Sequence, residues 1–363
     1  MKKITLFVCI LSLSLCVSAQ VTVAVSPSVE LTAILARTAG YQEYCMDDGG
    51  QYTKDTEQWF GTYRAHPSVL YFNRLRQQFG VAYDAVMNLA VNISVDAEGV
   101  RWMDTDLQSM DRRWSKVDKD TLLMRLNDFC RDTRFHAFFT AHYPFYDRAV
   151  EAYKANVMGL LRQEWYPAFY GTAPEETFRV IIGCTNGGGN YGANRACRGR
   201  AKELFAIVGY VENPAARTPY ADGAAYAATL IHEFNHSFVN PLLAKGDHWD
   251  QLKESADYLY RCSSLAMQRQ AYGNEQTVIN ESVVRAAVIC YMMDNGCKRE
   301  DVQHELYNQV ARDFKWMPEL VTALRRYARE RRKYPTLESY YPEIAKVLAK
   351  YADRERKRIE GCL

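Results

Sequence analysis

Along the first half of the chain, apolar residues recur mainly at the three- and four-residue spacing of amphipathic helices. The exception is VTVAV, residues 21–25, where alternating β-branched residues predict a strand. Proline favours the first turn of a helix and glycine its end, so these residues mark the expected boundaries. The pattern predicts helices over residues 29–37, from Pro67 to Gly80 and over residues 146–164, within a mainly helical stretch between residues 52 and 165.

The pattern changes near Thr177. Two runs rich in β-branched residues, FRVIIGC at 178–184 and ELFAIVGYV at 203–211, predict strands. The segment between them, residues 185–200, contains a glycine-rich stretch. It lacks the Gly-Lys-Ser/Thr ending of a phosphate-binding loop and enters no helix directly, so we favour a hairpin or flap over nucleotide binding.

The remaining chain returns to helical spacing. Asp222 is placed to cap a helix that Asn240-Pro241 ends or bends. Further helices are expected over residues 249–267 and 277–294, and residues 300–359 are helical and charged, with Pro318 and Pro342 marking breaks or helix starts. The apolar stripe of the first of these helices consists of Ala227, Ile231, Phe234 and Phe238. Together the elements predict an α+β fold that is mostly α.

An apolar run near the N-terminus differs from the later ones in its flanks. Lys2 and Lys3 precede the run at residues 4–15, and small residues follow at 17–19. This order is typical of a signal peptide. We therefore predict that residues 1–19 are removed and that the protein is exported, to the periplasm or outside the cell. No later run is long enough to span a bilayer, so stable membrane insertion is not expected.

The net charge bears on which partners the protein can bind, and the cysteines bear on whether it contains disulfides. Residues 20–363 carry equal numbers of acidic and basic side chains, 43 of each, since Lys2 and Lys3 account for the excess. A neutral surface gives no reason to expect nucleic acid as a partner. In an exported protein disulfides are allowed. We predict two, which pair Cys184 with Cys197 and Cys290 with Cys297.

The sequence His232-Glu233-Phe234-Asn235-His236 is an H-E-x-x-H motif within a predicted helix. Residues four apart lie on one helix face, so both imidazoles can bind one Zn²⁺. Glu233 is then placed to act as general base on the water that the metal activates. The alternative is two histidines on a polar face with no metal. With seven histidines in the chain, chance produces the motif on the order of once per hundred such sequences.

A catalytic zinc site needs a third protein ligand and an open fourth position. A metzincin would have glycine at 239 and histidine at 242, but the chain has Val239 and Leu242, so that class is excluded. His248, Glu254 and Glu281 remain as candidates. A carboxylate on an apolar, buried helix is unfavourable unless something binds it, and Glu281 alone occupies such a helix. Glu281 is therefore the favoured third ligand.

Further polar residues near the motif have two interpretations each. Arg285, one turn beyond Glu281, is suited to orienting that carboxylate or stabilising an oxyanion, and equally to a structural ion pair. Tyr191 and Tyr272 are candidates for donating to a developing oxyanion, with ordinary packing as the alternative. Asn240 either orients a ligand or caps the bend at Pro241.

An H-E-x-x-H helix followed by a helix with N-E-S-x-x-R resembles the gluzincin arrangement of zinc metallopeptidases, over residues 223–294. More widely, VTVAVSPSVEL, YRAHPSV, LIHEFNHSFVNP and NESVVRA resemble an uncharacterised family of exported bacterial HExxH proteins, a domain of unknown function. The resemblance implies a peptidase-like zinc site at His232, His236 and Glu281, with Glu233 as base, and it supplies no substrate. The interval between His236 and Glu281 is longer than in well-studied gluzincins.

These features predict a zincin-like fold with a small sheet beside the motif helix. Residues 20–176 form a mainly helical N-terminal part with a leading strand, 177–297 the catalytic core and 298–363 a helical C-terminal part, unless residues 20–363 form one domain. The expected activity is zinc-dependent hydrolysis of a peptide or protein substrate, which one of the strands between residues 178 and 211 binds by backbone pairing. Two alternatives stay open, a non-catalytic zinc-binding scaffold or binding protein and a zinc amidase acting on cell-wall fragments.

Overall fold

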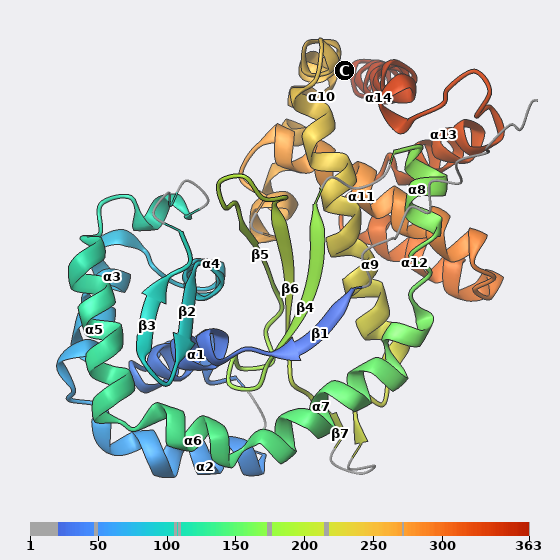
Figure 1. Cartoon of the computed structure of the whole chain (residues 1–363). Coiled ribbons are helices and arrows are strands. Elements are labelled where there is room, and N and C mark those ends of the chain that lie inside the picture. The colour runs from blue at the N-terminus through green and yellow to red at the C-terminus, as the bar shows by residue number, and fades with distance from the viewer. Residues whose placement is uncertain are drawn as a thin grey trace, which may run out of the picture.

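The structure, a computed structural model, describes residues 21–46, 50–104, 107, 110–172, 176–213, 218–270 and 272–362 (Figure 1). The predicted signal peptide therefore lies outside the described residues. Within those residues, no helix combines the length and the apolar character that a membrane span requires. The fold is α+β and mostly α, as the sequence predicts.

The bounds of the regular elements are as follows. The strands are β1 (Thr22–Val25), β2 (Ile93–Asp96), β3 (Gly99–Trp102), β4 (Thr177–Gly183), β5 (Tyr191–Arg195), β6 (Glu203–Gly209), β7 (Glu212–Asn213) and β8 (Thr218–Pro219). The helices are α1 (Pro27–Thr38), α2 (Gln51–Phe60), α3 (Pro67–Phe79), α4 (Asp84–Val91), α5 (Lys119–Asp132), α6 (Phe135–Ala141), α7 (Tyr143–Asn156), α8 (Trp165–Tyr170), α9 (Gly223–Val239), α10 (His248–Arg269), α11 (Glu275–Asp294), α12 (Arg299–Ala311), α13 (Met317–Arg329) and α14 (Leu337–Glu360).

A four-stranded sheet in the order β1-β4-β6-β5 stands at the centre of the molecule (Figure 1). β1, β4 and β6 are parallel, and β5 is an antiparallel edge strand on β6. The inner strands β4 and β6 are near-continuous apolar runs because both faces of the sheet are covered. Phe178 of β4 contacts Phe234 of α9 edge to face, so α9 covers one face. Arg195, on the opposite face of β5, donates to the carbonyl of Val91 in α4.

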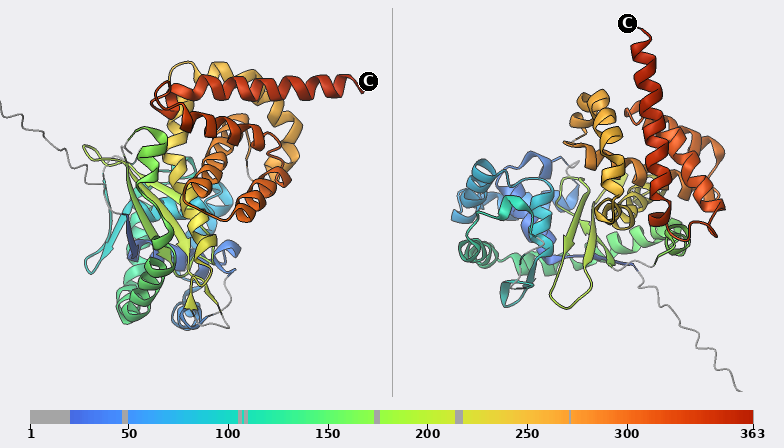
Figure 2. Two further views of the ribbon diagram at one scale, coloured as in Figure 1. Left: turned by 90° about the vertical axis from the view of Figure 1, so that its right-hand side faces the viewer. Right: turned by 90° about the horizontal axis from the view of Figure 1, so that it is seen from above.

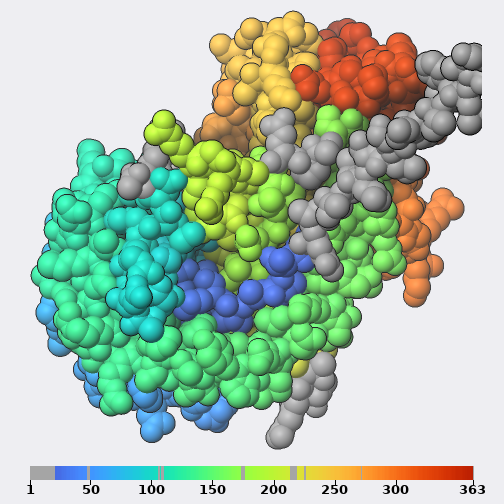
Figure 3. All heavy atoms as spheres, viewed as in Figure 1, coloured from blue at the N-terminus to red at the C-terminus, as the bar shows by residue number. Residues whose placement is uncertain are grey.

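The helices on either side of the sheet form two groups, which Figure 3 shows as teal and orange-red surfaces flanking the yellow-green strands. α1 to α7 and the hairpin β2–β3 make the N-terminal group, and α10 to α14 the C-terminal group. α11 is apolar on all sides rather than along one stripe, because α9, α10, α12 and α13 surround it. α14 packs along α10, and its end projects from the rest of the molecule (Figure 2).

Most expected elements form, with three differences. The helix predicted over residues 146–164 begins earlier, at Tyr143, and ends at Asn156. Pro342 lies inside α14 and does not interrupt the helix. It occupies the second turn, where a proline removes one backbone hydrogen bond. The sequence interpretation also missed β2, β3, β7 and β8 and the bounds of β5, although the hairpin favoured for residues 185–200 is confirmed, since β5 lies in that segment and pairs antiparallel with β6.

Neither predicted disulfide is present, because all eight described cysteines are free. Cys184 directly follows β4, level with the C-terminal end of β6, whereas Cys197 follows β5, level with the N-terminal end of β6. At about 3.3 Å per residue the length of β6 alone separates them by more than a disulfide can span. Cys290 is buried within α11, while Cys297 is exposed beyond the end of that helix.

Candidate metal centre

His232 and His236 project from α9 because the opposite side of that helix is anchored in the core. The predicted stripe of Ala227, Ile231, Phe234 and Phe238 is buried, each residue 9% exposed or less. One helical turn separates the two histidines, so both rings face α11. The apolar pattern of α9 therefore fixes the direction of both imidazoles.

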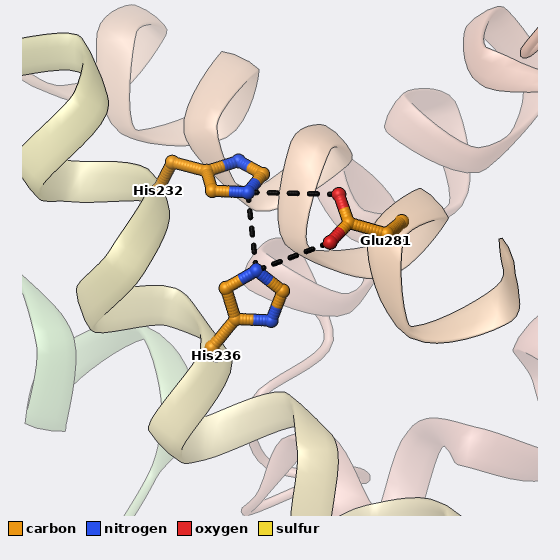
Figure 4. Close-up of side chains that lie close together, drawn as sticks. All are labelled: His232, His236 and Glu281. Atoms are coloured by element: carbon orange, nitrogen blue, oxygen red, sulfur yellow. Dashed lines mark hydrogen bonds and ion pairs between the residues drawn. The ribbon is translucent and has the colours of Figure 1, made fainter. Parts of the chain in front are cut away.

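Glu281 meets the two histidines from α11 (Figure 4). The Nε2 atoms of His232 and His236 lie 3.1 Å apart. Oε1 of Glu281 is 3.3 Å from Nε2 of His236, and Oε2 is 3.5 Å from Nε2 of His232. Among the residues that the structure describes, no other group of three His, Cys, Asp or Glu side chains converges in this way. These three residues could hold a metal ion.

The electrostatics of Glu281 and His232 suit a cation, whereas burial lowers the pKa of His236 but its hydrogen bond to Glu281 and the carboxylate charges outweigh burial and raise it. Burial raises the pKa of the Glu281 carboxyl, but the hydrogen bond from His236 and the charges of both histidines and Arg285 outweigh it and lower the pKa to about 2. Burial is also the main reason that the pKa of His232 falls to about 3. An ionised carboxylate beside a neutral imidazole is the protonation state in which both can bind a metal.

Arg285 and Tyr272 hold Glu281 from behind. Nε of Arg285 donates to Oε2 of Glu281 at 3.1 Å, and its Nη2 donates to the Tyr272 hydroxyl at 2.6 Å. That hydroxyl in turn donates to the same Glu281 oxygen at 3.1 Å. Nη1 donates to Gln309 of α12 at 3.0 Å. Arg285 and Tyr272 are therefore both at the site. Their donor groups are used to orient the Glu281 carboxylate and are not directed at an open position for an oxyanion.

Asn240 orients the second histidine. Its Oδ1 lies 3.1 Å from Nδ1 of His236, so it can accept a hydrogen bond from that nitrogen, which leaves Nε2 directed at Glu281. Asn235, by contrast, accepts a hydrogen bond from Tyr170 of α8 and lies at 0% exposure away from the triad. Asn240 therefore contacts a histidine of the triad, whereas Asn235 satisfies a buried hydroxyl in the core.

Glu233 lies on the side of α9 that faces the sheet. Burial raises the pKa of its carboxyl, which makes it a better proton acceptor than an exposed glutamate. Gly192 of β5 approaches it closely, because a Cβ at position 192 would be 3.0 Å from Oε2 of Glu233. Gly192 was not a candidate from the sequence, and only the missed strand β5 could have indicated it.

A cleft of about 310 Å³ opens beside Glu233 and His236, between α9 and the sheet. Its lining comes from both sides: Phe178, Gly192, Asn194, Leu204 and Ala206 from the strands, with Phe234, Ser237 and Pro241 from α9 and the turn after it. The candidate base and one candidate ligand are therefore accessible from a hollow formed by the edge of the sheet.

Three candidates from the sequence lie elsewhere. Glu254 is exposed on α10 and forms an ion pair with Arg356 at 3.4 Å. His248, at the start of α10, packs its ring 4.9 Å from that of Tyr341. Tyr191 stacks on Tyr44 at 5.8 Å, on the face of β5 opposite to Gly192, because successive strand residues alternate between faces. None of the three contacts the triad, and the position of Tyr191 agrees with the alternative of ordinary packing.

Comparison with known proteins gives one family. Residues 21–347 match a family described as Domain of unknown function (DUF4932). No curated protein and no solved structure matches the chain.

Proposed function

Since the chain belongs to the family described as Domain of unknown function (DUF4932), we propose from the geometry of its site that the protein is a gluzincin-like zinc metallopeptidase. The observation that carries the proposal is the convergence of His232, His236 and Glu281, with Glu233 on the same helix beside a cleft. A purely structural metal site has no use for a buried carboxylate at the position of Glu233.

The donor set fits Zn²⁺. Two imidazole nitrogens and one carboxylate oxygen are the ligands of a His₂Glu catalytic zinc site. Ligands about 2.1 Å from a tetrahedral ion lie roughly 3.4 Å from one another. The two histidine nitrogens lie 3.1 Å apart, and a Glu281 oxygen lies within 3.3 to 3.5 Å of each of them, Oε1 beside His236 and Oε2 beside His232, which is close to that spacing. Arg285 and Asn240 each orient a ligand, as the surroundings of metal sites commonly do.

In the proposed reaction, the zinc ion and the side chains of the protein have different roles. Bound zinc supplies Lewis acidity, which polarises a carbonyl and lowers the pKa of water. Glu233 accepts the proton of the attacking water and transfers it to the leaving amine, for which its raised pKa is suited. His232, His236 and Glu281 hold the ion, while Arg285 and Tyr272 keep Glu281 ionised and oriented.

The edge strand β5 supports a peptide as the substrate. Among the residues that the structure describes, β5 pairs with β6 alone. A peptide in extended conformation can add to the free edge by backbone hydrogen bonds, which recognise a peptide chain independently of its sequence. Gly192 on that strand lies against Glu233, so a chain paired there passes the proposed base. This arrangement favours a peptide over a non-peptide amide.

Metal analysis and turnover test the proposal together. Purified protein should contain about one zinc per chain and should cleave a mixed peptide library. Glu233→Gln should retain zinc and lose turnover by roughly 10³-fold or more, because the proton acceptor is gone. Glu281→Ala should lose zinc, whereas the matched variant Glu254→Ala, which removes an exposed glutamate of α10, should keep it.

The two alternatives predict different results. Zinc bound without turnover of any peptide or cell-wall fragment would support a non-catalytic scaffold or binding protein. Turnover of cell-wall fragments alone would support an amidase. Absence of zinc from the wild-type protein, or equal zinc loss in Glu281→Ala and Glu254→Ala, would contradict the proposed site.

A further inference from the structure

The sheet face toward α9 changes from small to bulky residues with distance from Glu233. In register, Gly192 of β5 lies beside Ala206 of β6, and both residues are small. Two positions along the strands, Phe178 of β4 lies beside Leu204 of β6. Side chains two apart on a strand share a face, so both rows point toward α9. Gly192 and Ala206 leave space next to Glu233, and Phe178 and Leu204 bound that space together with Asn194, which lies beside Leu204 on β5.

The cleft beside Glu233 consequently has an apolar floor. Phe178 and Leu204 from the sheet and Phe234 from α9 line it, with Pro241 beyond them. Phe178 and Leu204 are half-buried, so each presents apolar surface to the hollow. Water against such surface is displaced favourably by another apolar group, at about 25 cal/mol per Å² buried. The floor therefore favours an apolar occupant.

The charged residues at the cleft give no reason for a charged occupant. Apart from Glu233 and His236 of the candidate site, the charged residues that line the hollow are Glu176 and Lys202, which carry opposite charges. A cleft that selects an acidic or basic side chain needs an excess of the other sign, as in protease specificity pockets. The volume of about 310 Å³ is at the lower end of ligand-binding clefts, which suits amino-acid side chains rather than a large cofactor.

We propose that this cleft is a specificity pocket, which binds a large apolar side chain of the substrate next to the cleaved bond. Leu204, Phe178 and Phe234 are its specificity-determining residues. The inference rests on the proposed peptidase function, because it is the proximity of the cleft to Glu233 and His236 that identifies its occupant as a substrate side chain.

The first arm of the test compares cleavage of peptides that differ at one residue. Quenched peptides identical except for Leu, Phe, Ser or Asp beside the cleaved bond are offered to the wild type. The apolar peptides should be cleaved with a kcat/KM about 10- to 100-fold higher. Leu204→Lys should remove that preference while zinc content stays unchanged. The matched control is Leu265→Lys, at a residue 73% exposed on α10, which should behave as wild type.

The second arm measures binding and does not depend on turnover. Fluorescence anisotropy of labelled peptides on the Glu233→Gln variant should show tighter binding of the Leu and Phe peptides than of the Ser and Asp peptides. Adding Leu204→Lys should abolish the difference, about tenfold or more in Kd.

The two arms separate failure of the pocket from failure of the function. Cleavage or binding without preference for apolar peptides, or a preference that survives Leu204→Lys, overturns the specificity pocket and leaves the peptidase proposal standing. Selective binding of apolar peptides with no cleavage by the wild type supports the pocket and contradicts the peptidase.

Discussion

At the scale of single residues, Gly192 allows the edge of the sheet to reach the proposed base. Its backbone is not in the left-handed region, so the requirement for glycine is steric rather than conformational. The row that it shares with Ala206 also opens the cleft. One missing side chain therefore serves both the approach to Glu233 and the space for a substrate.

Replacing Gly192 by alanine should reduce turnover without removing the metal. The new Cβ would lie 3.0 Å from Oε2 of Glu233, which is closer than a comfortable contact and displaces the carboxylate. A displacement of a fraction of an ångström at a catalytic group lowers kcat by about tenfold or more. Steady-state kinetics and zinc analysis measure the two effects.

Gly273→Ala is the control for this substitution, because nothing lies within 4 Å of a Cβ at position 273 and its backbone is likewise outside the left-handed region. It should leave kcat unchanged. Equal effects of the two substitutions, or none from Gly192→Ala, would show that the close approach has no catalytic consequence.

The residues that the sequence located correctly are those whose spacing carries the chemistry. His232, His236 and Glu233 follow from one motif, and the burial of Glu281 follows from the apolar helix around it. Tyr272 and Arg285 were named, but their mutual hydrogen bond depends on the turn before α11, which no spacing predicts. Gln309 was missed because it comes from another helix, α12, and carries no motif.

At the scale of elements, α1 carries a buried acid of its own. Glu30 is fully buried and accepts hydrogen bonds from the Tyr52 hydroxyl, the Cys184 amide and the Thr185 hydroxyl. Burial nevertheless dominates and raises the pKa of its carboxyl from 4.5 to about 7. The junction between α1 and the end of β4 thus contains a group that titrates near neutral pH.

This group should make stability depend on pH in a defined direction. Below about pH 4.5 Glu30 is protonated in both folded and unfolded chains. As pH rises from 4.5 to about 7, the unfolded chain loses its proton first, so the free energy of unfolding falls, by roughly 3 kcal/mol in total. Above pH 7 the contribution is constant.

Denaturant unfolding of the wild type and Glu30→Gln across this range isolates the effect. The difference in stability between the two proteins should change by roughly 3 kcal/mol between pH 4.5 and 7.5, since other titrating groups cancel. A flat difference for Glu30→Gln would mean that the pKa of Glu30 is the same in the folded and the unfolded chain.

The elements themselves could be predicted to different extents. α9 and α11 follow from long apolar patterns with clear ends, and the structure confirms both. β5 is five residues long, contains a glycine and follows a glycine-rich loop, so its alternation is too weak to recognise. Without the bounds of β5, the sequence could not predict that Gly192 faces Glu233 and that Tyr191 faces away, because side chains are assigned to a face only once the strand is known.

At the scale of the whole molecule, the triad brings together α9 and α11, which α10 separates along the chain. A bound ion should therefore stabilise the folded chain. At a free zinc concentration about 100 times the Kd the gain is roughly 2.7 kcal/mol, which raises Tm by roughly 5 °C. Thermal unfolding with and without a chelator measures the difference.

The shift should vanish in His232→Ala, which removes one of the three side chains proposed to bind the metal. His136→Ala, which changes an exposed histidine of α6, should retain the full shift. A chelator effect of equal size in both variants would place the stabilising ion elsewhere.

The packing of α9 against α11 also determines when in the life of the chain the site can exist. A chain that has not yet folded presents at most His232 and His236, on a helix of 17 residues that is marginal in isolation. The carboxylate of Glu281 arrives only after α10 has turned the chain back, and the cleft only after β5 has joined the sheet. On the proposed function, a chain that has not yet folded cannot cleave itself or its neighbours, because the proposed ligand Glu281 and the cleft are not yet beside the motif.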